Sequence, residues 1–257
     1  MTINFALTIA GSDTSGGAGI QADIKTFRAF GVQDLSLITA LTAQNTLGIQ
    51  DIFEVPSKFI ASQLDAIVSH IRPDAFKTGM LYSESAVKTV ASKIKEYGLK
   101  NLVVDPVVSS TTGTVLADHQ AMEALKNELL PLSTVVTPNL KEASILAQMA
   151  VEDVESMKEA ARVIMDFGPQ AVIVTGGHLL RQPVDILWDG NDFTILEGTR
   201  IEGWFHGTGC VFSASLTASI ARGKSLAMAF KEAREFVQKA IRTALKGLTP
   251  GLRLLQL

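Results

Sequence analysis

Apolar residues follow two different patterns along the chain. Short runs of consecutive, often β-branched apolar residues alternate with longer stretches in which apolar positions recur every three to four residues. The first pattern is typical of strands buried on both faces, and the second is typical of amphipathic helices. The predicted strands cover residues 5–10, 35–43, 75–78, 102–104, 134–136 and 171–174. The predicted helices cover residues 20–30, 57–71, 83–97, 154–167, 209–221 and 225 to about 246.

The alternation of these elements indicates the fold class. Strands that are apolar on both faces and separated by helix-length segments predict a mostly parallel central sheet with helices on both faces. The segments 184–188 and 193–196, joined by Asp189-Gly190-Asn191-Asp192, predict a short antiparallel appendage. No linker rich in proline or serine and no long internal repeat divides the sequence. We therefore expect a single three-layer α/β domain over residues 1–257.

Composition narrows the functional classes. The chain has 257 residues, of which 47% are hydrophobic and 19% charged, so it can bury a large core and does not resemble a disordered chain. Its formal net charge of −3 gives no basic field for nucleic acid or an anionic membrane, and we expect neither partner. The single cysteine, Cys210, cannot form an internal disulfide. Because no targeting segment and no apolar run of membrane-spanning length is evident, we expect a cytoplasmic protein.

Polar residues gather where the predicted strands end. A glycine-rich loop containing Asp13 follows the first strand, and later strands end at Gln44, at Thr78-Gly79-Met80, at Asp105 and at Asn139. Ligands of open α/β sheets bind beyond the carboxyl ends of the strands. One polar residue at such a place is equally well explained by the chain reaching water. So many of them together predict a binding site at this edge of the sheet.

The segment His206-Gly207-Thr208-Gly209-Cys210 directly precedes a predicted helix. The backbone N–H groups and the dipole at a helix N-terminus attract anions, so this segment is a candidate phosphate site. The same field lowers the pKa of a thiol, which makes Cys210 a candidate thiolate; the alternative is a small buried cysteine in a first helical turn. Neither glycine cluster matches a Walker A motif or the dinucleotide-binding fingerprint.

Any metal is expected on oxygen ligands. The four histidines lack the spacing of a metal site, and no Gly-x-Ser-x-Gly nucleophile elbow is present. Asp105, Asn139 and Glu142 carry the oxygen atoms that suit Mg²⁺ brought in on a nucleotide.

A collinear set of segments carries a more specific signal. The segments are Leu7-Thr8-Ile9-Ala10-Gly11-Ser12-Asp13, Ser15-Gly16-Gly17-Ala18-Gly19-Ile20-Gln21-Ala22-Asp23, Thr42-Ala43-Gln44-Asn45, Lys77-Thr78-Gly79-Met80-Leu81, Asp105-Pro106-Val107, Thr137-Pro138-Asn139-Leu140-Lys141-Glu142-Ala143, Gly176-Gly177-His178-Leu179 and Gly207-Thr208-Gly209-Cys210. This set resembles the hydroxymethylpyrimidine/phosphomethylpyrimidine kinases of thiamine biosynthesis, which are ribokinase-like proteins. The resemblance implies a three-layer ribokinase-like fold, ATP and Mg²⁺ as cofactors, and a homodimer.

The resemblance also implies an activity, which is ATP-dependent phosphorylation of 4-amino-5-hydroxymethyl-2-methylpyrimidine and of its monophosphate. Gln44 would read the aminopyrimidine, because a side-chain amide donates and accepts hydrogen bonds at once. Asp23 would hold a polar edge of the substrate. The residues implied as lining the ring pocket are Gly11, Met80 and Val107.

The phosphoryl-transfer residues come from the other segments. Cys210 is implied as the base for the hydroxymethyl group. The residues implied as an anion hole are Gly207, Thr208 and Gly209. The residues implied at the ATP phosphates are Asp105, Asn139, Glu142, Thr175 and Gly177, with Asp105 and Glu142 as the Mg²⁺ ligands.

Two departures from the family pattern leave alternatives open. Thr175 stands where the family usually has a lysine that would contact the ATP phosphates, and Trp204-Phe205 precede His206 in place of the usual Asn-Thr. One alternative is a pyridoxal kinase, because that subgroup phosphorylates a similar hydroxymethyl group on a pyridine. The other is a non-catalytic pyrimidine-binding relative with a weakened ATP site.

Overall fold

The fold is built on a nine-stranded sheet. The computed structural model describes residues 3–45, 47–109, 113–179, 182–246 and 252–257. The strand order is β3-β2-β1-β4-β5-β6-β7-β8-β9. The strands from β2 to β7 in this order are parallel, whereas β3, β8 and β9 pair antiparallel with their neighbours at the two edges. The strand bounds are β1 Phe5–Asp13, β2 Gln33–Asn45, β3 Gly48–Glu54, β4 Ala75–Thr78, β5 Leu102–Val104, β6 Val135–Val136, β7 Val172–Gly176, β8 Val184–Trp188 and β9 Phe193–Glu197.

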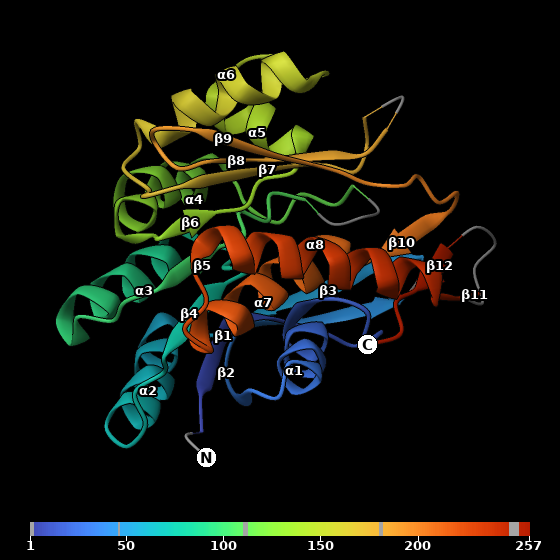
Figure 1. Ribbon diagram of the computed structural model, residues 1–257. Coiled ribbons are helices and arrows are strands. Elements are labelled where there is room, and N and C mark those ends of the chain that lie inside the picture. The colour runs from blue at the N-terminus through green and yellow to red at the C-terminus, as the bar shows by residue number, and fades with distance from the viewer. Residues whose placement is uncertain (1–2, 46, 110–112, 180–181, 247–251) are drawn as a thin grey trace.

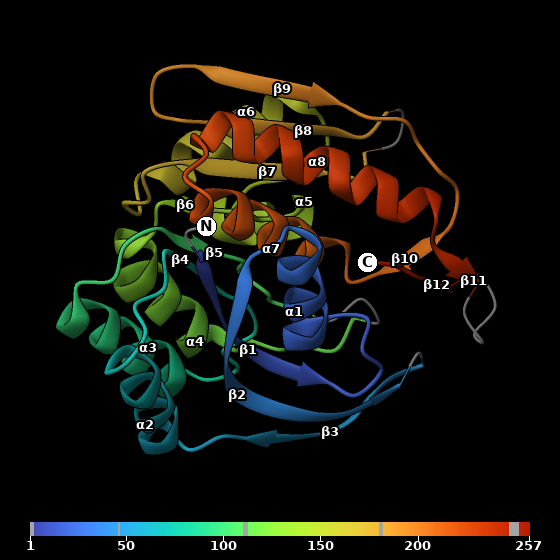
Figure 2. The same cartoon turned by 60° about the horizontal axis from the view of Figure 1, so that its bottom comes forward.

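Helices cover both faces of this sheet (Figures 1 and 2). One face carries α1 (Gly19–Ala29), α7 (Thr208–Ala221) and α8 (Leu226–Arg242). The other face carries α2 (Ser57–Val68), α3 (Glu84–Tyr97), α4 (His119–Ala124), α5 (Leu140–Ala147) and α6 (Val154–Met165), with a π-helical turn over Leu125–Leu129 and a 3-10 turn over Leu130–Leu132 after α4. The predicted three-layer α/β architecture is confirmed.

The central strands are apolar because neither of their faces meets water. In β5, Leu102 and Val104 pack into the core beneath α3, while Val103 packs into the core beneath α7 and α8. The same alternation recurs in β7, where Ile173 faces the opposite side from Val172. Successive side chains of a strand point to opposite faces, so a sheet covered on both sides requires an apolar residue at every position.

Several elements differ from the sequence predictions. The hairpin of β8 and β9 is no appendage, because β8 pairs with β7 and extends the main sheet. The last long helix ends at Arg242 and not near residue 246. The helix α5 was not predicted, although Asn139 and Glu142 form a capping box at its start, which is a sequence signal for a helix N-terminus.

A small second sheet joins two distant segments. The strand β10 (Trp204–His206) pairs in parallel with β12 (Leu252–Leu254), and β12 pairs antiparallel with β11 (Leu245–Lys246). Both figures show it at the same end of the molecule as the tips of β2 and β3. Trp204 lies opposite Leu252, and Phe205 lies opposite Arg253, whose guanidinium is 5.7 Å from the Phe205 ring centre. The unusual Trp204-Phe205 pair is therefore engaged with the C-terminal segment.

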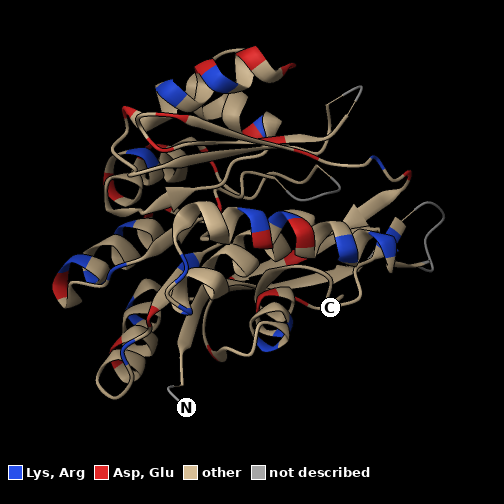
Figure 3. Cartoon of the chain, viewed as in Figure 1, with Lys and Arg blue, Asp and Glu red and all other residues tan. Residues whose placement is uncertain are grey.

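The exposed helices carry mixed charge. Figure 3 shows Lys and Arg interspersed with Asp and Glu along α3 and α8, in keeping with the small net charge of −3. Within the described ranges, no helix combines the length and the apolar content needed to cross a bilayer.

Candidate active site

Two glycine-containing loops meet at the carboxyl edge of the sheet. Gly207 caps α7 with φ +83°, and a Cβ built on it would lie 1.9 Å from the carbonyl oxygen of Gly17. A side chain at this position would therefore strain the backbone and clash with the opposite loop. The approach brings the predicted anion hole at Gly207, Thr208 and Gly209 against the glycine-rich loop that follows β1.

A contact between two buried side chains fixes this approach. His206 Nε2 lies 2.9 Å from Asp13 Oδ2, and both side chains are almost fully buried. The backbone N–H groups of Ser15 and Ala18 also donate to the Asp13 carboxylate, each at 2.8 Å. Burial alone would raise the pKa of Asp13, but the hydrogen bonds from His206 and Ser15 outweigh it and lower the pKa to about 2. Asp13 is thus an anion that ties the two loops together.

The predicted ring-pocket residues lie beside these loops. A Cβ on Gly11 would lie 2.3 Å from Met80 Cε, so Gly11 is small because the methionine thioether covers it. The backbone carbonyl of Met80 is fixed by the Thr39 hydroxyl at 2.6 Å. Gln44 is partly exposed at the end of β2, with its Nε2 3.4 Å from His206 Nε2. Gly11 and Met80 are therefore in contact, and Gln44 lies next to the His206 side chain.

The other two residues predicted for the ring pocket, Val107 and Asp23, lie in different surroundings. Val107 is partly exposed and donates its N–H to the Asp105 carbonyl at 2.9 Å. Asp23 is fully buried, with Oδ2 accepting from Thr8 at 2.6 Å and Oδ1 2.9 Å from Lys77 Nζ. Since both of its oxygens are engaged inside the protein, Asp23 does not present a polar edge to a substrate. We assign its carboxylate to Lys77 instead.

Lys77 is a site residue that the sequence reasoning missed. Its side chain has no exposed surface, and its ammonium lies 2.9 Å from Asp23 and 3.6 Å from Asp105. Burial would lower the pKa of Lys77, but the two carboxylates outweigh it and raise the pKa, so the side chain is a cation. The sequence contained a signal for this residue, since Lys77 is the only charged residue in the predicted strand 75–78. Lysine is almost never fully buried without a partner, so a lysine in a buried strand predicts a buried ion pair.

Cys210 lies in the first turn of α7, as predicted, but its protonation differs from the prediction. Burial raises the pKa of its thiol to about 12; Lys77 opposes this shift, and the charges of Asp105 and Asp23 add to it. The shift is opposite in direction to the lowered pKa expected from the helix N-terminus, because burial and the charges of Asp105 and Asp23 outweigh the effect of Lys77.

The predicted nucleotide residues form a second group at the same edge. Asn139 caps α5 in a reciprocal pair with Glu142, and Thr175 is bridged to Asn139 through the neighbouring backbone. Burial and the nearby charge of Asp105 raise the pKa of Glu142 to about 8. Gly177 is exposed just after β7. The structure thus brings Asn139, Glu142 and Thr175 together and places Asp105 between them and Cys210.

Asp105 and Glu142 are the candidate metal ligands of this group. Asp105 and Glu142 are close enough to repel each other, which favours a cation nearby. However, the Glu142 carboxylate already accepts the N–H of Asn139 at 2.9 Å, and no group of three or more candidate ligands occurs among the described residues. These residues therefore fit a Mg²⁺ ion that takes most of its ligands from nucleotide phosphates, and they do not form a complete site by themselves.

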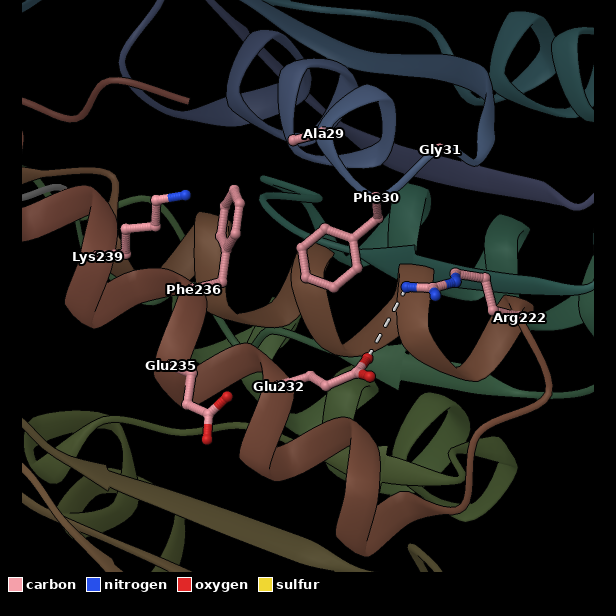
Figure 4. Close-up of a pocket in the computed structure, with 8 residues that line it drawn as sticks. All are labelled: Ala29, Phe30, Gly31, Arg222, Glu232, Glu235, Phe236 and Lys239. Atoms are coloured by element: carbon pink, nitrogen blue, oxygen red, sulfur yellow. Dashed lines mark ion pairs between the residues drawn. The ribbon is translucent and has the colours of Figure 1, made fainter.

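A surface groove lies far from this site. It opens between the end of α1 and the side of α8, where Phe30 and Phe236 meet edge to face at 4.9 Å (Figure 4). Arg222, which pairs with Glu232 in this groove, follows the last turn of α7. Since Cys210 lies at the first turn of the same helix, the groove is at the opposite end of α7 from the reactive residues.

The geometry of the edge suits transfer of an anionic group to an alcohol. The start of α7 carries Gly207, Thr208 and Gly209, and the backbone N–H groups of a helix N-terminus attract anions such as a phosphoryl group. Cys210 lies in the same helical turn, and Asp105, near the Asn139–Glu142 pair, contributes to the electrostatics of its thiol. Phosphoryl transfer depends mainly on this kind of positioning and charge stabilisation.

Comparisons with known proteins agree with this interpretation. Residues 13–251 match the model of the phosphomethylpyrimidine kinase family. The hydroxymethylpyrimidine/phosphomethylpyrimidine kinase of Bacillus subtilis is 43% identical over 251 residues, covering 95% of this chain and 92% of the relative. An ADP complex of Bacillus subtilis pyridoxal kinase is similar in structure, with a TM-score of 0.91 and 39% identity over 99% of this chain and 97% of that one. Phosphomethylpyrimidine kinase from Clostridium difficile gives a TM-score of 0.83 and 38% identity over 93% of this chain and 99% of that one. The chain belongs to the phosphomethylpyrimidine kinase family and has its ribokinase-like fold.

Proposed function

We propose that this protein is a hydroxymethylpyrimidine and phosphomethylpyrimidine kinase of thiamine biosynthesis. It phosphorylates 4-amino-5-hydroxymethyl-2-methylpyrimidine and then converts the monophosphate to the diphosphate, using ATP. The observation that carries the proposal is the match of residues 13–251 to the family together with the close approach of the Gly207 loop to the glycine-rich loop and of Gln44 to His206.

The pyrimidine end of the reaction is assigned to the region around Gln44. The Gln44 amide can donate to a ring nitrogen or accept from an exocyclic amine, and its Oε1 already accepts from Thr42 at 3.3 Å. The thioether of Met80, packed on Gly11, supplies a polarizable apolar surface for the ring. These contacts support an aromatic substrate with a polar edge.

The phosphoryl end is assigned to the start of α7. The N–H groups of Gly207, Thr208 and Gly209 would stabilise the charge that develops on the transferred group. The Cys210 thiolate accepts the proton of the substrate hydroxyl, whose oxygen forms the new bond to phosphorus while ADP leaves. Because the thiol has a pKa near 12 in the free protein, the thiolate is scarce at neutral pH but strongly basic when formed.

The nucleotide is assigned to the neighbouring loops. We place the ATP phosphates near Asn139, Thr175 and Gly177, which follow the ends of β6 and β7. Mg²⁺ bound to those phosphates would neutralise their charge, with Asp105 and Glu142 as its protein partners. We further propose one ribokinase-like domain over residues 1–257, acting as a homodimer in the cytoplasm, where ATP is available.

Pyridoxal kinase remains the second candidate, because a pyridoxal kinase gives a TM-score of 0.91 against this chain. Both substrates offer a hydroxymethyl group on an aromatic nitrogen ring, so the fold does not separate them. The curated relative at 43% identity is named as a pyrimidine kinase, which favours the pyrimidine. A non-catalytic pyrimidine-binding protein is the third candidate. It rests on Thr175, which stands where the family usually has a lysine.

The first prediction tests the activity itself. We expect the protein, incubated with ATP, Mg²⁺ and the pyrimidine alcohol, to yield the monophosphate and then the diphosphate. Mass spectrometry of the products measures both. Pyridoxal is expected to react with a lower kcat/KM. Faster turnover of pyridoxal would make this protein a pyridoxal kinase, and tight binding of the pyrimidine without any product would make it a binder.

The second prediction concerns ring recognition. Gln44→Ala should weaken binding of the aminopyrimidine by about 1–3 kcal/mol, because polar groups of the buried ring edge lose their partner. Pyridoxal, which lacks the amino group, should lose less. Isothermal titration with both ligands measures the difference, and Gln50→Ala on the exposed strand β3 is a matched control. Equal losses for both rings would give Gln44 a structural role only.

The third prediction concerns the base. Cys210→Ala should leave the Kd of the pyrimidine nearly unchanged and lower kcat by ~10²-fold or more. Since the thiol pKa is near 12, the wild-type kcat/KM should rise with pH from 6.5 to 9 as the thiolate fraction grows. The ratio of wild type to Cys210→Ala isolates this dependence, and Cys210→Ser controls for packing. A ratio that does not change with pH would remove Cys210 as the base.

The fourth prediction concerns Thr175. Thr175→Lys places a cation next to Asn139 at the proposed phosphate site, where charge-assisted hydrogen bonds are stronger than those of a hydroxyl. It should raise kcat/KM for ATP and leave the Kd of the pyrimidine unchanged. The gain should shrink as ionic strength rises, because a partly exposed charge is screened. ATP titrations at low and high salt check this, and unchanged ATP parameters would mean that the loop does not reach the phosphates.

A further inference from the structure

A fully buried lysine occupies the middle of the molecule. Every residue of β4 is buried, as a strand covered on both faces requires, but one of its four positions holds Lys77 and not an apolar residue. Its ammonium is 2.9 Å from Asp23 Oδ1 on α1 and 3.6 Å from Asp105 Oδ2 after β5. One cation thus joins three neighbouring elements beneath the reaction site.

Lys77 is connected to the first turn of α7 through Asp105. The Oδ2 atom of Asp105 that faces Lys77 also accepts a hydrogen bond of 2.9 Å from the hydroxyl of Ser213. Ser213 is fully buried, and its hydroxyl oxygen lies 3.1 Å from the backbone carbonyl oxygen of Cys210. One carboxylate oxygen is therefore shared by the buried cation and by the helical turn that carries Cys210.

We propose that Lys77 is a positioning residue for phosphoryl transfer. Its ammonium holds Asp105 toward Ser213 and so fixes the first turn of α7, which carries Cys210 and the anion hole. It also supplies the one positive charge that the described structure places among Asp23, Asp105 and the site of the incoming phosphoryl group. The role in transfer rests on the kinase function proposed above, whereas the effect on Cys210 does not.

The chemistry of the surroundings supports a role beyond packing. A hydrophobic residue of similar size would fill this space without the cost of burying charge, and replacing buried ion pairs in this way is often neutral or stabilising. Two carboxylates beside a reacting anion would otherwise repel it. Lys77 also opposes the effect of burial and of both carboxylates on the thiol of Cys210.

The test uses three variants of the full chain. Lys77→Met removes the charge, Asp23→Asn/Lys77→Met removes the charge together with its first partner, and Ser213→Ala breaks the connection to α7 while leaving all three charges in place. For each variant we would measure kcat and KM for the pyrimidine, the denaturation midpoint, and the rate at which iodoacetamide alkylates Cys210 at pH 8 without substrate. Cys210 is the only cysteine of the chain, so alkylation reports on it alone.

A surface lysine provides the matched control. Lys93 on α3 also bridges two carboxylates, at 2.8 Å from Asp65 and 2.9 Å from Glu96, but it lies on the face away from α7. Lys93→Met and Asp65→Asn/Lys93→Met should leave kcat and the alkylation rate within twofold of wild type.

We expect Lys77→Met to lower kcat about 10- to 100-fold, to change KM less than threefold, and to slow alkylation of Cys210. The double variant should regain part of the denaturation midpoint without regaining kcat, because Asp23 no longer carries an unpaired buried charge but Asp105 is still not held. Ser213→Ala should lower kcat at least threefold. Wild-type kcat in the double variant, or in a folded Lys77→Met, would reduce Lys77 to a structural role.

Each possible failure has a distinct meaning. If neither lysine variant folds, Ser213→Ala decides, since it removes one hydroxyl group only, and wild-type kcat there would overturn the proposal. If the wild-type protein forms no phosphorylated product, the proposed function fails, and the alkylation rates still test the coupling of Lys77 to Cys210. Unchanged alkylation in Lys77→Met would then overturn that coupling.

Discussion

The burial of one ammonium group between two carboxylates constrains the centre of this protein. Removing charge from water is costly, and a buried ion pair that loses one partner destabilises a protein by about 3–5 kcal/mol. Lys77 can remain buried only while Asp23 on α1 and Asp105 after β5 keep their places. The helix α1, the strands β1, β4 and β5 and the start of α7 are therefore held in one arrangement, and this arrangement forms the floor of the candidate active site.

The edges of the site depend on close approach of backbone rather than on charge. The loop after β1 and the loop before α7 come so near to each other that a side chain at Gly207 would collide with the carbonyl of Gly17. The Asp13–His206 pair joins the same two loops from the side. One loop carries Asp13 and the other carries the residues proposed as the anion hole, so their contact fixes the relative position of the two proposed halves of the site.

The departures from the family pattern have different physical meanings. Trp204 and Phe205 form a strand with the C-terminal segment. The Phe205 ring lies against the Arg253 guanidinium, whereas the Trp204 side chain is largely exposed, so the pair has a role in the second sheet. Thr175 lies beside Asn139 in the group assigned to ATP, so its missing charge bears directly on nucleotide affinity. Both departures are unusual residues in a family motif. Their contacts give Trp204-Phe205 a structural role and place Thr175 beside the proposed nucleotide site.

The sequence by itself determined the layer architecture and the family, because apolar runs and glycine motifs are local patterns that can be recognised in the sequence alone. It also indicated that Gln44, Asp105 and Asn139 lie at one edge, since parallel strands end together, and that Cys210 lies at the start of a helix. Only the tertiary structure decided the electrostatics. Asp23 and Lys77 are 54 residues apart in the chain, and the pKa of the Cys210 thiol depends on burial and on carboxylates from other elements. A helix N-terminus can be predicted from the sequence, but the burial and the charge of its surroundings depend on how the molecule packs.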